Sequence, residues 1–137
     1  MLQVVKFDEQ LKEQILGLEK SCISICEGLQ AAFSLKFLKL HVELTVSLIR
    51  NKKGKQAGPN HIFDDHYESS IEVGFVENQE YYPNAYIPIW KLKQDMFDKI
   101  GYLTEYNAHE LEQKLTCILE EMYEERIEVV KEGKTID

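Results

Sequence analysis

The stretch most suited to chemistry is NHIFDDHYESSIEV, residues 60–73, which holds two of the four histidines together with two aspartates and two glutamates. A metal site needs three or four ligands that converge from one side. In a strand, His66 and Glu68 would project from the same face about 7 Å apart, and no further ligand follows at a fixed spacing. We therefore predict no tight transition-metal site at His61, Asp64 and His66, and no cofactor.

Catalytic motifs are absent from the rest of the sequence. It contains no G-x-S-x-G, P-loop, G-x-G-x-x-G or H-E-x-x-H pattern. The three cysteines, Cys22, Cys26 and Cys117, are expected to be buried thiols that pack as small apolar side chains. We expect no catalytic residues, although groups from distant segments could still converge, so an enzyme remains an alternative.

Composition narrows the classes of partner. The chain has 137 residues, of which 44% are hydrophobic and 29% charged, which fits one soluble domain over residues 1–137. No apolar run approaches the ~20 residues of a membrane span, and the N-terminus is not a signal peptide, so we expect a cytoplasmic protein. The net charge is −8, and the basic cluster from Arg50 to Lys55 is short. We expect a basic protein as the partner, and neither nucleic acid nor a membrane.

Two long helices are predicted, one towards each end of the chain. Asp8 can cap the first, over about residues 8–34, because apolar residues recur there at steps of three and four. Asn107 with Glu110 three residues later is typical of a helix start, and apolar spacing continues that helix to Gly133.

Three strands are predicted between these helices. Residues 38–50 and 66–76 alternate with period two and should pair as a hairpin; for a turn near residues 56–57, one allowed register sets Ser47 opposite His66 and His41 opposite Glu72. Residues 85–90 form a third strand, placed at an edge because Pro88 cannot donate a hydrogen bond. Residues 91–101 read as a short helix that stops at Gly101.

These elements predict an α+β fold. We expect an antiparallel sheet of three strands, or slightly more, covered on one face by the long N-terminal and C-terminal helices. The side chains expected to face the helices are Leu40, Val42, Leu44, Val46, Ile71, Val73 and Phe75.

One segment stands out as a partner surface. Residues 56–90 contain no Lys or Arg, yet they carry half of the chain's aromatic side chains and six acidic residues. Tyrosines ringed by carboxylates suit a basic partner, because tyrosine gives buried anchor area and the acids steer association. We predict that the partner-binding residues are Glu68, Glu72, Glu77, Glu80, Tyr81 and Tyr82. The glutamate-rich face of the C-terminal helix is the alternative surface.

The leading hypothesis is therefore a non-enzymatic protein-binding module. Its concrete forms are a toxin-neutralising protein of the immunity or antitoxin type and a chaperone for an effector. The alternatives are a small-molecule-binding or enzymatic domain with a pocket between sheet and helices, and a structural homodimer. Such a dimer would join through residues 85–90 or through the N-terminal helix.

Overall fold

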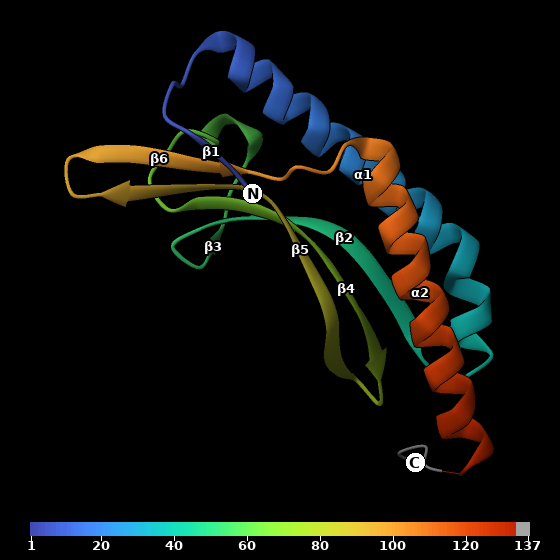
Figure 1. Cartoon of the computed structure of the whole chain (residues 1–137). Helices are drawn as coiled ribbons and strands as arrows, with labels where there is room; N and C mark the ends of the chain where they lie inside the picture. The colour runs from blue at the N-terminus through green and yellow to red at the C-terminus, as the bar shows by residue number, and fades with distance from the viewer. Residues whose placement is uncertain (134–137) are drawn as a thin grey trace.

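The computed structural model describes residues 1–133 and shows an α+β fold (Figure 1). Six antiparallel strands form one open sheet in the order β1-β6-β5-β4-β2-β3. The sheet is therefore larger than the three strands predicted. In chain order the elements are β1 (Leu2–Val4), α1 (Glu9–Leu38), β2 (Glu43–Lys52), β3 (Lys55–Gln56), the 3₁₀ turn η1 (Pro59–His61), β4 (Tyr67–Glu77), β5 (Glu80–Asp95), β6 (Asp98–Leu103) and α2 (Ala108–Lys131).

Both helices start where the sequence predicts. Asp8 accepts a hydrogen bond from the Leu11 backbone N–H at 2.8 Å. Asn107 and Glu110 form the reciprocal capping box, with N···O distances of 2.9 and 3.0 Å. The helix α1 runs to Leu38, however, and His41 adopts a φ of 67° in the turn that follows. The predicted strand over residues 38–42 is thus wrong, because burial of Phe37 continues the helix by one more turn.

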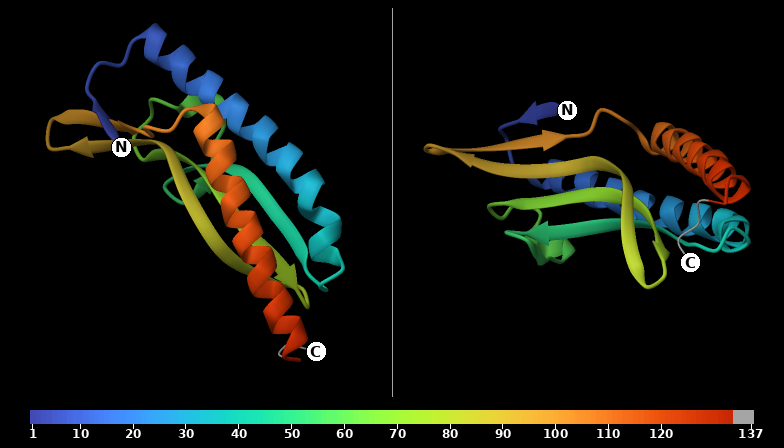
Figure 2. Two further views of the ribbon diagram at one scale, coloured as in Figure 1. Left: turned by 45° about the vertical axis from the view of Figure 1, so that its right-hand side comes forward. Right: turned by 90° about the horizontal axis from the view of Figure 1, so that it is seen from below.

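The helices cover one face of the sheet, as predicted (Figures 1 and 2). Alternation within β2 and β4 sends one set of side chains into the core and the other set to the uncovered face. Among the predicted core residues, Val42, Leu44, Val46, Ile71 and Val73 are buried, and Phe75 packs against them while partly exposed. Leu40 is only half-buried and lies in the turn before β2.

The strand register differs from the prediction. Ser47 pairs with Glu72, and His41 lies outside the strand. The cause is local: Lys53 and Gly54 have φ of 53° and 78°, which turns the chain tightly back into β3. A further loop through η1 then leads to β4, so the two long strands are not joined by one simple hairpin.

The largest difference from the prediction is at residues 91–101. They form no helix: β5 continues to Asp95, turns, and pairs with β6 (Figure 1). Gly101 is not a helix stop; it leaves room for the Trp90 ring, which an added Cβ would overlap. The predicted edge strand is also wrong, because β5 lies between β4 and β6 inside the sheet. Pro88 lies at a register shift opposite Ser70; among the described residues, it falls in the stretch of β5 that pairs with β4 alone.

Candidate functional site

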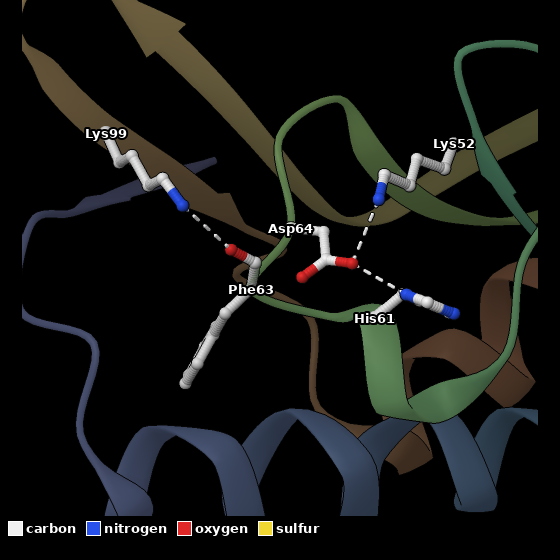
Figure 3. Close-up of polar contacts among 5 residues, drawn as sticks. All are labelled: Lys52, His61, Phe63, Asp64 and Lys99. Carbon is white, nitrogen blue, oxygen red and sulfur yellow. Dashed lines mark hydrogen bonds and ion pairs between the residues drawn. The ribbon is translucent and has the colours of Figure 1, made fainter.

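In the structure, the acidic and histidine-rich stretch makes contacts that hold its loop in place. We call the contacts of Asp64 with His61 and Lys52 the clamp. His61 Nδ1 lies 2.6 Å from Asp64 Oδ2, and Lys52 Nζ donates to the same oxygen at 3.0 Å (Figure 3). Lys99 Nζ donates to the Phe63 carbonyl at 3.3 Å. The hydrogen bond with His61, and then that with Lys52, lowers the pKa of Asp64. These contacts fasten the loop before β4 to β2 and β6.

That stretch does not gather metal ligands. His66 is exposed and has a φ of 64°. Within residues 1–133, it forms no hydrogen bond or ion pair with His61 or Asp64. Over the same residues, no group of three His, Cys, Asp or Glu side chains is arranged to hold a metal ion.

A histidine oriented by an aspartate could act as a general base, and nucleophilic catalysis by a side chain would also need a nucleophile beside it. In the described part of the chain, no Ser, Thr or Cys side chain is hydrogen bonded to His61. Cys22 and Cys26 are buried in α1, and burial raises their pKa to about 12 and about 11, so both remain protonated thiols at neutral pH. Cys117 is exposed, which corrects the prediction that all three thiols are buried.

The six predicted binding residues lie on two different faces. In β4, Glu68 and Glu72 alternate with the buried residues Ile71 and Val73, so they project from the face that the helices leave open. Tyr81 pairs with Val76 and shares this open face. The other three, Glu77, Glu80 and Tyr82, belong to the helix-facing side of the β4–β5 hairpin.

Two of the three helix-facing residues, Glu77 and Tyr82, make contacts within the protein that stabilise the fold. Glu77 is buried and makes a two-point ion pair with Arg126 of α2, whose Nε also donates to the Leu40 carbonyl at 3.2 Å. Tyr82 stacks on Phe75 with ring centroids 5.5 Å apart. A carboxylate committed to a buried guanidinium is not available to a partner, so we assign Glu77 to stability.

Two of the three open-face residues, Tyr81 and Glu72, contact each other directly. The Tyr81 hydroxyl donates to Glu72 Oε1 at 2.9 Å. Gly74 makes this possible, because a Cβ at Gly74 would lie 2.5 Å from Tyr81 Oη and 2.6 Å from the Tyr82 carbonyl oxygen. Tyr81 therefore lies flat across β4 and still leaves 43% of its surface exposed. Partial burial, and then the hydrogen bond to Glu72, raises its pKa.

Tyr86 is a site residue that the sequence reasoning missed. It pairs with Glu72 across the strands, and its side chain is 55% exposed. A shallow pocket of about 360 Å³ lies here, lined by Glu72, Pro83, Asn84, Ala85 and Tyr86. The sequence held a partial signal, because Tyr86 lies in the predicted strand two residues before Pro88. The strand register is needed to show that its side chain belongs to the open face. We call Glu72, Tyr81 and Tyr86 the tyrosine–glutamate cluster.

The opposite end of the open face is lined with lysines. Asn51, Glu68 and Lys91 pair in one row across β2, β4 and β5, and Lys53 and Lys93 lie beyond it. Lys91 Nζ is 4.0 Å from Glu68 Oε2. The sequence shows these lysines as two separate short groups, and only the strand pairing brings them together.

The alternative acidic surface on α2 is present as well. Five glutamates are exposed along this helix: Glu120, Glu121, Glu124, Glu125 and Glu128. No aromatic side chain is exposed among them, since Tyr123 is half-buried and forms an edge contact with Phe37.

The chain was compared with known proteins. No family model matches it, and the searches of curated proteins and of solved structures found no match. Within residues 1–133, neither helix is long and apolar enough to cross a membrane.

Proposed function

We propose that this protein is a non-enzymatic binding module that holds a basic protein on the open face of its sheet. The observation that carries the proposal is the tyrosine–glutamate cluster: two exposed aromatic rings flank one carboxylate on a face that no helix covers.

This cluster suits a cationic side chain. A lysine or arginine entering the pocket beside Tyr86 would meet the Glu72 carboxylate and an aromatic face together. A cation over a tyrosine ring gains ~0.5–1 kcal/mol at an exposed site, and a charge-assisted hydrogen bond adds to it. Because Glu72 and Gly74 already hold Tyr81 in place, little side-chain entropy is lost on binding.

The charge of the segment favours the same partner. Residues 56–90 carry no Lys or Arg, and the net charge of the chain is −8, so a basic surface would be attracted from a distance. A toxin-neutralising protein and a chaperone of a basic effector are the concrete forms that meet this requirement.

The test starts with a partner captured from host lysate and confirmed by reconstitution from purified components. Association should slow as salt rises, because the Debye length is only ~8 Å at physiological ionic strength. Tyr86→Ala and Tyr81→Ala should mainly speed dissociation, and Glu72→Gln should weaken binding.

Glu121→Gln is the matched control, since it removes one exposed glutamate from α2 and leaves the open face intact. If Glu121→Gln weakens binding while Glu72→Gln does not, the α2 surface is the binding site and the proposal is wrong. An acidic partner that binds independently of salt would also contradict it.

A further inference from the structure

The lysine end of the open face forms a pocket with a chemistry of its own. Its volume is about 390 Å³, and its lining comes from the end of β2 and the turn after it, from the start of β4 and the residue before it, and from β5. The residues that carry charge or donors there are Asn51, Lys53, His66, Glu68, Lys91, Lys93 and Gln94. Their segments are far apart in sequence and are joined by the row of paired strands β2, β4 and β5.

The charges of this pocket do not cancel. Among the lining residues whose side chains the structure describes, Glu68 is the one carboxylate, and Lys53, Lys91 and Lys93 bring three ammonium groups. Asn51 Nδ2 donates to its Oε1 at 3.3 Å, and Lys91 approaches its Oε2 only to 4.0 Å. Lys53 and Lys93 take part in none of the ion pairs of residues 1–133.

The nearby Asp64 does not supply the missing negative charge. Its carboxylate is held by Lys52 and His61 (Figure 3). Lys52 alternates with Asn51 along β2, so this clamp lies on the opposite side of the sheet from the pocket. The described lining, with three lysines and one glutamate, therefore has a formal net charge of about +2.

We propose that this pocket binds a phosphate monoester. Such a group carries a charge of about −1.5 to −2 at pH 7 and offers three strong acceptor oxygens, which matches the net charge and the number of lysines. Lysine is an established phosphate ligand that acts as a point charge, and the Asn51 amide adds a directional donor. The Glu68 carboxylate repels anions in this pocket, so a ligand with a single negative charge gains less there than a phosphate monoester.

The phosphate could belong to a small metabolite or to a phosphorylated side chain, and the probes separate the two. The full chain would be titrated at low salt with inorganic phosphate, a sugar phosphate, a phosphoserine hexapeptide and the same hexapeptide without phosphate. Backbone amide chemical shifts would report the site, and chloride at matched ionic strength would be the reference.

We expect shifts at Gly54, His66 and Lys93 with each phosphate compound and none with the unphosphorylated hexapeptide. Lys91→Gln and Lys93→Gln should each weaken binding about fivefold, the effect of one charge at contact distance in water. Glu68→Gln should tighten it by a similar factor, because it removes the opposing carboxylate. Tighter binding of the hexapeptide assigns the site to a phosphorylated protein, and tighter binding of the sugar phosphate to a metabolite.

Lys55→Gln is the control, because Lys55 is an exposed lysine of the adjacent strand β3 that does not line the pocket. An equal loss in Lys55→Gln and Lys93→Gln, or equal shifts with chloride, would overturn the proposal by showing general attraction of anions. Thermal unfolding of each variant would confirm that it folds. The outcome does not depend on the tyrosine–glutamate cluster, so the two proposals can fail separately.

Discussion

The two ends of the open sheet face differ in charge, in rigidity and in the way each is fastened to the helices. At one end, Tyr81 lies across Gly74 and is hydrogen bonded to Glu72. At the other end, lysines on flexible stems surround Glu68. The first arrangement fixes a shape before a partner arrives, whereas the second offers charge that adapts to its ligand. One sheet thus presents a preorganised surface and an adaptable one.

Each end is also tied to a helix by a buried ion pair. Glu77 of β4 binds Arg126 of α2 beneath the tyrosine–glutamate cluster. Near the lysine end, the fully buried Glu19 of α1 accepts from Arg50 Nε at 3.0 Å and from the Tyr67 hydroxyl at 2.6 Å. The Glu19 carboxylate has two different partners. Loss of one of them should therefore destabilise the fold less than loss of Arg126, the ion-pair partner of Glu77.

The largest expected effect separates these two pairs. Arg126→Met should lower the free energy of unfolding by ~3–5 kcal/mol, because Glu77 would stay buried without a counter-charge. Arg50→Met should cost less, because Tyr67 would still donate to Glu19. Urea unfolding of both variants measures the difference, and the Glu77→Leu/Arg126→Met double variant should recover most of the loss. Equal losses in the two single variants would show that the two ends are fastened alike.

A second test concerns the rigid end alone. Gly74→Ala should destabilise the fold by ~1–3 kcal/mol, because the new methyl would meet both the Tyr81 side chain and the Tyr82 backbone. Gly28→Ala is the matched control: nothing lies within 4 Å of a Cβ there, and this change in α1 should stabilise by up to ~1 kcal/mol. Unfolding midpoints would compare the two. A neutral Gly74→Ala with unchanged Tyr81 fluorescence would refute the close packing.

Acid should weaken the contacts that Asp64 makes with His61 and Lys52 on the helix-facing side of the sheet. The pKa of Asp64 is lowered in the folded state, so its contacts with His61 and Lys52 contribute stability above the ordinary carboxyl pKa of 3.8 and lose it as the pH falls through the lower folded value. In Asp64→Asn this part of the acid dependence should disappear. Unfolding measured between pH 5 and pH 2, at roughly half-unit steps, would check it. Parallel curves for the two proteins would rule out the clamp as the cause.

Alkali should act on the rigid end, with the smallest effect. The pKa of Tyr81 is raised above the ordinary 10.0 by partial burial and by Glu72, so its contribution to stability is complete below pH 10 and is lost as the pH rises through the folded value. Glu72→Gln should lower the pKa of Tyr81 towards 10.0. Absorbance titration of the wild type against Tyr81→Phe isolates this residue. A Tyr81 titration that is the same in Glu72→Gln would show that the hydrogen bond does not hold in solution.

Much of the fold follows from the sequence because its signals are local. Asp8 and Asn107 cap helices through their own neighbours, and alternation in β2 and β4 sorts buried from exposed side chains before any partner strand is known. The candidate surface was predicted only in part. Glu72 and Tyr81 were both included in the predicted surface, but their contact with each other was not foreseen. Glu77 has the parity of Val73 and Phe75, so it lies on the helix-facing side, where its partner Arg126 is 49 residues away.

Local patterns in the chain are enough to predict the two capped helices, the alternating strands and the acidic, aromatic segment. They fail at residues 91–101, where Leu92, Met96 and Phe97 have helical spacing but pairing with neighbouring strands sets the conformation. Leu92 is buried in β5, while Met96 and Phe97 are 85% and 93% exposed at the hairpin turn. The Trp90 ring occupies the space above Gly101, and the pairing of β5 with β6 places Trp90, Leu92 and Leu103 in one buried cluster. The same pairing places Lys91 and Lys93 beside Lys53, a proximity that depends on strand register and that no local pattern encodes.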